Sequence, residues 1–399
     1  MFLRRNRLLP SNFGGMNTSI EKQVIAKGAA RFSIGSLFFI AGLCFASWAS
    51  RIPDIKAHLN LSDGALGAVL LALPVGLMVS LPFSGWLVHH FGSRKMVLLS
   101  AVLYPLVLSC IGLVQETWQL VVVLFCYGLM GNLYNIAVNT QAVSLEVLYG
   151  RSIMASFHGI WSLAGFTGAA IGTLMINLRL LPFTHFCIIT GTALTFVCLV
   201  YRNTLRQDIN ADTDRPLFAK PDATLLKLGL IAMCCMVCEG AMFDWSGVYF
   251  QKVVLAPKGL IPLGYTAFMS TMAGGRFAGD RLVTRLGTLR MLQCSGLVIA
   301  SGLVIAITFP TLVTATLGFM LVGIGVSSVV PLVYGVAGKS TVFSPGVALA
   351  AVSTIGYLGF LAGPPMIGFI AQAASLRVSL AFIAVLGFMT TVISSKTKF

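Results

Sequence analysis

An acidic side chain inside a long apolar segment is the feature of this sequence best suited to chemistry. Glu239 lies half-way along the apolar segment 228–250, in the run Cys238-Glu239-Gly240, with no basic residue within one helical turn. A carboxyl group kept away from water can bind and release a proton near neutral pH, which a proton-driven process requires. The alternative is a neutral acid that is hydrogen-bonded to a neighbouring helix.

Carboxamide side chains recur with helical spacing in the segment 119–141. Asn132, Asn135 and Asn139 lie at positions i, i+3 and i+7 and share one face of a helix, and Tyr134 lies among them. A carboxamide both donates and accepts hydrogen bonds, which suits a hydroxyl-rich or zwitterionic solute. The alternative is a ladder of bonds between helices. The two interpretations stay open for Asn132 and Asn135, whereas packing is favoured for Asn139.

A histidine and a tryptophan are also spaced to share a helix face. His158 and Trp161 lie three residues apart in the segment 153–176. An imidazole can titrate or bond a solute, and an indole can stack on a sugar or another organic ring. A histidine that bonds to a neighbouring helix is the alternative. We therefore expect a substrate site formed by Asn132, Tyr134, Asn135, His158 and Trp161.

Two further motifs suggest cofactors but lack required residues. The run from Gly335 to Thr341 resembles a phosphate-binding loop, yet Val333 stands where the first glycine is needed. Cys235 and Cys238 have no histidine partner nearby, so packing is favoured over metal binding. We expect no cofactor and no metal. No nucleophile, base and orienting group can be placed together, so an enzyme is also disfavoured.

The elements that position these residues are predicted to be transmembrane helices. The 399-residue sequence is 57% hydrophobic and 10% charged, whereas soluble chains carry about 25% charged residues. Long apolar runs repeat along the chain, each able to cross a hydrocarbon core of roughly 30 Å. The predicted spans are 31–50, 65–88, 96–114, 119–141, 153–176, 183–201, 228–250, 262–283, 291–309, 312–333, 345–371 and 378–395.

The net charge of +15 follows the predicted topology. With twelve spans and a cytoplasmic N-terminus, 21 of the 27 Lys and Arg residues, Arg276 included, fall on the inner side. This asymmetry is typical of membrane proteins, so the basic residues indicate orientation rather than a nucleic-acid partner. Both termini are predicted to be cytoplasmic.

The sequence divides into two similar halves. The polar segment 202–227 is predicted to be a cytoplasmic linker between the half 31–201 and the half 228–395, with cytoplasmic tails 1–30 and 396–399. The run from Gly85 to Met96 returns as the run from Asp280 to Met291, with Leu-Val, the glycine, a basic residue and the methionine in register. Two matching bundles can rock around a site between them, as secondary transporters do.

The first of these basic turns resembles the signature of the major facilitator superfamily, Gly-x-x-x-Asp-Arg-x-Gly-Arg-Lys. Gly85, Gly92, Arg94 and Lys95 match it, whereas His89 replaces the acidic residue. In the second half Asp280 lies one turn earlier than the family's acid, followed by Arg281 and Arg285. These residues would position the inner turns against neighbouring helix ends.

The resemblance covers essentially the whole chain and implies an all-α integral membrane fold with twelve transmembrane helices. Three runs, which begin at Phe157, Glu239 and Gly356, also look like the little-described bacterial inner-membrane proteins of the YbjJ type. In the superfamily the outer ends of spans one and seven approach when the outer gate closes. Arg51 and Asp244 would then form a latch, unless Arg51 pairs with nearby Asp54 and Asp244 is solvated.

Alternating access should also bend corresponding helices of the two halves. The Pro364-Pro365 pair in span eleven, after Gly363, is expected to break the helical hydrogen-bond ladder. The glycine-containing run 165–170 in span five is the matching weak point. A static kink is the alternative interpretation.

We thus expect a secondary transporter that moves a small organic solute across a bacterial inner membrane by alternating access. Proton coupling through Glu239 and a polar, sugar-like solute are favoured. The expected partners are this solute, protons and the lipid bilayer, and the chain is expected to be a monomer. An exporter of hydrophobic compounds and a non-transporting membrane sensor or scaffold are the alternatives.

Overall fold

The computed structural model describes residues 13–150, 153–208, 222–340, 342–343 and 345–397. The side chains of residues 13–26, 155, 280 and 345–346 lie outside this description, as does most of the predicted linker, residues 209–221. The first half contains α1 (Phe13–His58), α2 (Asp63–Leu70), α3 (Ala72–Phe91), α4 (Ser93–Ile111), α5 (Thr117–Tyr149), α6 (Met154–Asn177), α7 (Pro182–Val200) and η1 (Tyr201–Asn203). The second contains α8 (Ala223–Lys252), η2 (Lys258–Leu260), α9 (Leu263–Leu286), α10 (Thr288–Thr308), α11 (Leu312–Val326), α12 (Val329–Ala337), α13 (Pro345–Ala373) and α14 (Leu376–Ser395).

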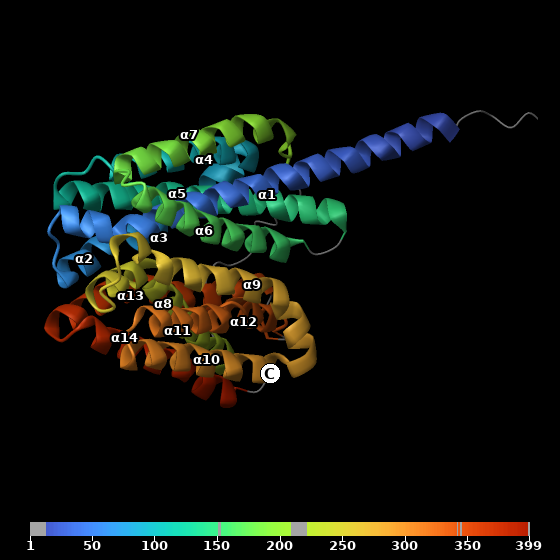
Figure 1. The fold of residues 1–399 in the computed structure, drawn as a ribbon. Helices are drawn as coiled ribbons and strands as arrows, with labels where there is room; N and C mark the ends of the chain where they lie inside the picture. Colours follow the sequence, from blue (N-terminus) through green and yellow to red (C-terminus); the bar gives the residue numbers. More distant parts are fainter. Residues whose placement is uncertain (1–12, 151–152, 209–221, 341, 344, 398–399) are drawn as a thin grey trace, which may run out of the picture.

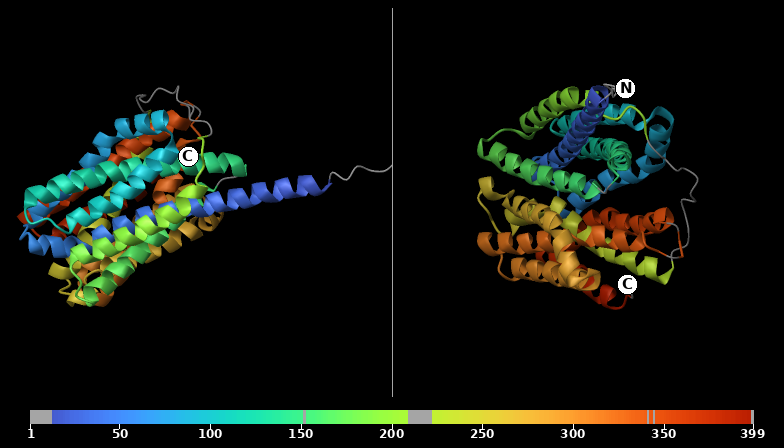
Figure 2. Two further views of the ribbon diagram at one scale, coloured as in Figure 1. Left: turned by 90° about the horizontal axis from the view of Figure 1, so that it is seen from above. Right: turned by 90° about the vertical axis from the view of Figure 1, so that its right-hand side faces the viewer.

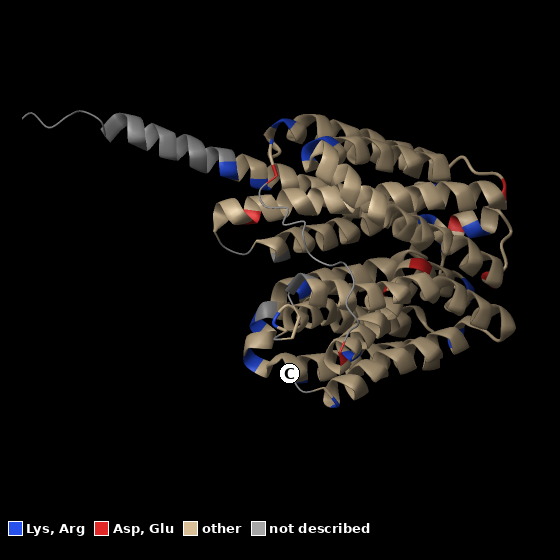
Figure 3. Ribbon diagram, turned by 180° about the vertical axis from the view of Figure 1, so that it is seen from behind, with Lys and Arg blue, Asp and Glu red and all other residues tan. Residues whose placement is uncertain are grey.

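These helices confirm the predicted all-α membrane fold. Within the described residues, 11 helical segments are long and apolar enough to cross a membrane. The 24-residue helix α9, which carries Arg276, Arg281 and Arg285, runs between the seventh and eighth of these. With α9 included, the helical segments fall at the twelve predicted spans, and their charged residues lie mostly toward the helix ends (Figure 3).

The helices form two bundles that lie one above the other in Figure 1. In the first bundle α1 packs on α6, α3 on α5 and α4 on α7. The equivalent pairs in the second bundle are α8 with α13, α9 with α11 and α10 with α14. The same helices in chain order are thus paired in both halves, as the internal sequence repeat predicts.

The repeated basic turns have the same backbone conformation. Gly92, between α3 and α4, has φ 83° and ψ 146°, and Gly287, between α9 and α10, has φ 77° and ψ 158°. Each glycine N–H donates to the carbonyl four residues earlier, at 2.9 Å and 2.8 Å respectively. This region of backbone space is essentially reserved for glycine, which explains why a glycine recurs in both turns.

Helix interruptions fall where the sequence analysis did not expect them. Span two is divided at Leu71, because Pro74 has no N–H to donate to the carbonyl of Leu70. Span ten is divided at Ser327 and Ser328, because Pro331 likewise leaves the carbonyl of Ser327 without its helical donor. Pro364 and Pro365 lie inside α13, which continues past them as one helix although neither proline has an N–H to donate to the helical ladder.

The first helix is longer than its predicted span. α1 begins at Phe13, inside the predicted tail, and has 46 residues. Its N-terminal part extends beyond the bundle (Figures 1 and 2). No proline falls between Phe13 and Arg51, so nothing in that stretch forces the helix to end.

Candidate functional site

The centre of the molecule contains an ion pair between two transmembrane helices. Glu239 lies on α8 and is 6% exposed. Nη2 of Arg276, on α9, lies 3.4 Å from its Oε1. The inner-side position predicted for Arg276 was therefore wrong, since its guanidinium group reaches the buried carboxylate. Glu239 is isolated on its own helix, but a charged partner reaches it from the next one.

Arg276 also bridges the two halves. Its Nη1 donates a hydrogen bond of 2.6 Å to Oγ of Ser162 on α6, in the first half. The guanidinium carbon lies 5.9 Å from the centroid of the Trp161 ring, over the ring face. The Nε atom is buried and has no hydrogen-bond partner. One side chain thus links Glu239 to the opposite bundle and still has a free donor.

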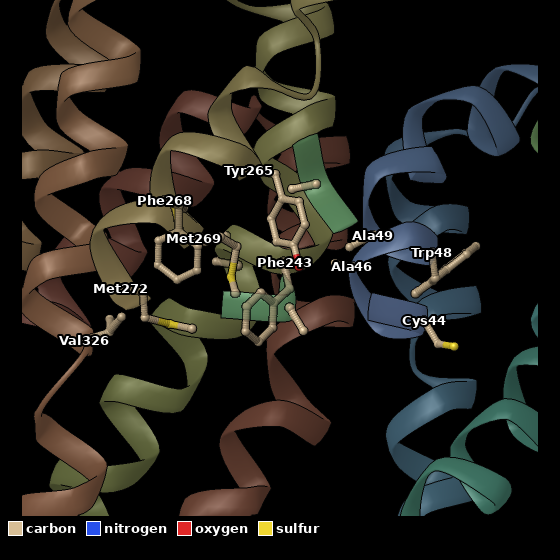
Figure 4. Packing of buried hydrophobic residues seen from close by; sticks show 14 of the residues in the cluster. Cys44, Ala46, Trp48, Ala49, Phe243, Tyr265, Phe268, Met269, Met272 and Val326 are labelled. Atoms are coloured by element: carbon tan, nitrogen blue, oxygen red, sulfur yellow. The ribbon is translucent and has the colours of Figure 1, made fainter. Parts of the chain in front are cut away.

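An aromatic cluster adjoins this ion pair through Trp161. Phe45 of α1 and Phe243 of α8 meet edge to face across the two halves, with ring centroids 5.2 Å apart. Trp161 and Tyr265 lie 6.5 Å and 6.1 Å from Phe243 by the same measure. Figure 4 shows Phe243 and Tyr265 on adjacent helices, facing α1. The cluster gives the site an apolar, ring-lined wall.

His158 lies one turn from Trp161 and Ser162 on α6 and is exposed. Its ring is in edge contact with Phe38 of α1, with centroids 5.7 Å apart. The structure therefore brings His158, Trp161, Glu239 and Arg276 into one region. Of the five residues expected to contact substrate, only His158 and Trp161 belong to this cluster.

The carboxamide residues of α5 have other partners. Asn132 is buried and donates a bond of 3.4 Å to Ser84 of α3. Tyr134 is also buried, and its hydroxyl donates to the carbonyl of Leu37 at 2.9 Å. Asn139 donates to Oδ1 of the exposed Asn135 at 2.7 Å. The contact of Asn132 corresponds to its packing alternative, and the hydroxyl of Tyr134, expected to contact substrate, is bonded to the backbone of α1.

The expected latch between Arg51 and Asp244 is absent from the described contacts. Arg51 donates to Asp54 at 2.6 Å, to Nδ1 of His185 at 3.2 Å and to the carbonyl of Leu180 at 2.9 Å. Its side chain is 3% exposed. The guanidinium therefore links α1 to α7 within the first half. Asp244 is half-buried on α8.

A different ion-pair cluster joins the halves at the end predicted to face outward. Asp63, in the first turn of α2, lies 2.8 Å from Nζ of Lys252 and 3.0 Å from Nζ of Lys56. Lys56 belongs to the same half as Asp63, whereas Lys252 ends α8 in the other half. Beside this cluster the N–H of Gly64 donates to the side chain of Gln372 at 3.3 Å.

Away from this end, α6 of the first half contacts α9 of the second half. α6 and α9 touch at Thr173 and Thr266 and again at Arg276 and Ser162. Beyond Arg276, Phe277 is 59% exposed although it faces Gly159 across the interface. The contacts between the two halves thus continue past Arg276 to Gly159 and Phe277.

The basic turn of the first half contacts the end of α7. Arg94 donates to the carbonyl of Arg202 at 3.3 Å, and its guanidinium carbon lies 4.9 Å from the Tyr201 ring centroid. Asp208, from the start of the linker, accepts the Ser93 N–H at 2.8 Å. A carboxylate thus reaches this turn from the linker, while His89 is exposed.

The other residues of the two turns make fewer contacts. Gly85, Lys95, Arg281 and Arg285 are exposed, and the side chain of Asp280 lies outside the described residues. The contacts of Arg94 place a cation at the carboxyl end of a helix, where it is favoured electrostatically.

Sequence reasoning missed Arg276, Ser162 and the Lys252–Asp63 pair. Arg276 fell inside the predicted span 262–283, and a charge at that depth was itself the available signal. Ser162 gave no signal, since a serine in an apolar helix most often bonds its own backbone. Lys252 and Asp63 are 189 residues apart, so only the fold brings them together.

Comparisons with known proteins agree with this architecture. The sequence model of the Major Facilitator Superfamily matches residues 34–344. An uncharacterized MFS-type transporter of Yersinia pestis is 36% identical over 377 residues, which cover 93% of this chain and 97% of that protein. The membrane protein MosC of Rhizobium meliloti is 31% identical over 378 residues, covering 94% and 90%. A solved D-xylose–proton symporter shares the fold, with a TM-score of 0.73 and 13% identity over 92% of this chain and 98% of that one.

Proposed function

The chain belongs to the major facilitator superfamily, and we propose that it moves a small polar organic solute across a bacterial inner membrane by proton-driven alternating access. The family assignment and the membrane fold rest on the family match and the close relatives. The solute class, the proton coupling, the inner membrane and the cytoplasmic termini are proposals. The narrower resemblance to the YbjJ type remains a prediction.

The ion pair between Glu239 and Arg276 is the observation that carries this proposal. A buried carboxylate beside an arginine can release that arginine when it takes up a proton, because a neutral carboxyl group attracts a guanidinium far less. Arg276 also donates to Ser162 across the interface. Proton uptake at Glu239 would therefore change a contact between the halves.

Alternating access then follows from the two ends of the molecule. We propose that the ion pairs of Lys56, Asp63 and Lys252 hold the outward end closed in the state that is open toward the inside. In the opposite state this cluster would separate and the inner ends would meet. A solute bound beside His158 and Trp161 would thus be exposed to one side at a time.

Reconstitution into liposomes loaded with a pH-sensitive dye tests this function. Sugars, polyols, amino acids, organic acids and hydrophobic cations are added outside in turn, and proton entry is recorded. We expect proton entry with a polar solute and a proton gradient that drives uphill uptake. Glu239→Gln should abolish uphill uptake and keep solute exchange.

Asp244→Asn is the matched control for Glu239→Gln. Asp244 lies on the same helix and has no ion-pair or hydrogen-bond partner in the part of the chain that the structure describes, so uphill uptake should persist. Uphill uptake that survives Glu239→Gln would overturn the coupling role of Glu239. A response to hydrophobic cations alone would instead favour an exporter of such compounds.

A further inference from the structure

We propose that the transported solute carries one carboxylate or a similar single negative charge, which binds Arg276 in place of Glu239. This inference rests on the proposed proton-coupled transport and names the solute class of the same site. In the outward-open state a proton moves from the outer solution to Glu239, and the solute anion takes over the guanidinium. In the inward-open state both leave, and Glu239 pairs with Arg276 again.

The geometry of Arg276 suits an exchange of anions. Its contact with Glu239 is 3.4 Å, longer than the roughly 2.7–2.9 Å of a strong charge-assisted hydrogen bond. Its Nε is buried without a partner, so one donor of the planar fork is unused. A guanidinium offers donors in parallel pairs that match a carboxylate, and Nε with Nη2 forms such a pair. A bound carboxylate would supply the missing acceptor.

The position of Arg276 makes it available to a solute. Its side chain is 18% exposed, on the inner side of the contact between Phe45 and Phe243. Trp161 offers a ring face beside the guanidinium, and the exposed His158 lies one turn earlier on the same helix. The body of the anion would therefore lie against an indole ring, while its charged group pairs with the arginine.

The surrounding charges favour a single negative charge on the solute. Arg276 is the cation that meets Glu239, and His158 faces Arg276 from α6. Tyr265 of α9 lies within electrostatic range of both Glu239 and Asp244. Tyr334 of α12 and Tyr357 of α13 are likewise within electrostatic range of Glu239. One guanidinium neutralises one negative charge, so a solute with several charges would leave the others without a counter-charge.

Binding of matched probe pairs to the purified protein tests this inference. Gluconate and sorbitol differ by a carboxylate in place of a hydroxymethyl group, and benzoate and benzyl alcohol form a second such pair. Apparent affinities come from the dependence of the unfolding temperature on probe concentration. Wild type should prefer at least one carboxylate over its neutral partner at pH 5.5 and lose much of this preference at pH 8.

Variants of Glu239 and Arg276 distinguish binding of the carboxylate at Arg276 from a nonspecific effect of the probe's charge on the protein. Glu239→Gln leaves Arg276 without its competitor, so it should bind the preferred carboxylate about tenfold more tightly than wild type at pH 8, with little dependence on pH. Arg276→Gln alone could fail to fold, because it leaves Glu239 buried without a partner. The double variant Glu239→Gln/Arg276→Gln avoids this unpaired charge. Its ratio of carboxylate affinity to neutral-partner affinity should be about 10-fold or more lower than that of Glu239→Gln.

Two results would overturn the inference. One is equal binding of each carboxylate and its neutral partner, or no binding of either carboxylate, in Glu239→Gln. The other is a carboxylate preference that persists in the double variant. The proposed transport function fails separately, when no solute causes proton entry into liposomes. If a neutral solute causes proton entry that depends on Glu239, the transport function holds and the anionic solute class is wrong.

Discussion

Asp63, in the first turn of α2, forms an ion pair of 2.8 Å with Lys252, the last residue of α8, and so joins the two halves at the end predicted to face outward. The same carboxylate lies 3.0 Å from Lys56, whose side chain is 5% exposed. Asp63 therefore has two roles. It neutralises a buried lysine within its own half, and it holds the other half in place.

Asp63→Asn and Lys252→Gln should separate these two roles. Asp63→Asn leaves Lys56 buried without a counter-charge and should cost about 3–5 kcal/mol of stability. Lys252 is 44% exposed, so Lys252→Gln should change stability by about 1 kcal/mol or less. Denaturation in detergent measures both changes. Equal costs for the two variants would show that Lys56 does not depend on Asp63.

Both variants should also weaken closure of the outward end. Spin labels at Asn60 and Lys258, on outward loops of the two halves, report the separation of these ends. The outward-open population should rise in Lys252→Gln although its stability is nearly unchanged. A distance distribution identical to that of wild type would contradict the role of this pair in closure.

Arg51 and Asp244 should behave independently. Arg51→Gln removes a 3%-exposed guanidinium that bonds Asp54, His185 and the Leu180 carbonyl, so it should cost about 3–5 kcal/mol. Asp244→Asn should leave stability nearly unchanged. A double-mutant cycle on unfolding free energies should give a coupling near zero, because no contact joins them in this state. A coupling of about 1 kcal/mol or more would show that Arg51 and Asp244 do interact, as the predicted latch requires.

Replacing Asn132 and replacing Asn135 should have different effects on stability. Asn132→Ala removes a buried hydrogen bond to Ser84 and should cost about 1 kcal/mol of stability. Asn135 is exposed, so Asn135→Ala should leave the unfolding temperature close to that of wild type. Solute binding by Asn135→Ala, measured on the folded protein, then decides its substrate role. Unchanged binding would remove Asn135 from the site.

The sequence predicted the helices well because their signal is local. Among the described residues, hydrophobic length places 11 of the spans, all but α9, and the glycines of the repeated turns occupy a backbone region that favours no other residue. Helix breaks were predicted less well. Pro331 interrupts its span, whereas Pro364 and Pro365 do not interrupt theirs, so the packing around each proline decides the outcome.

Only some residues of the candidate site could be predicted from the sequence, because their contacts are not local. Glu239 and Trp161 were evident because an acid or an indole stands out in an apolar segment. Their partners depend on tertiary packing. Arg276 contacts Glu239 from a different helix, and it contacts Ser162 in the other half of the molecule. The spacing of Asn132 and Asn135 correctly put them on a helix, but one residue faces α3 and the other does not. Periodicity alone cannot choose between these directions.

Glycine in the two basic turns provides the sharpest test of the internal repeat. Gly92 and Gly287 have φ 83° and φ 77°, so Gly92→Ala and Gly287→Ala should each cost about 1–3 kcal/mol. Gly85 is the matched control, because it lies inside α3 and an added Cβ meets nothing within 4 Å. Gly85→Ala should be neutral or slightly stabilising, since alanine favours a helix. Unfolding measurements on the three variants check this, and equal effects at Gly85 and Gly92 would show that backbone conformation is not why glycine recurs.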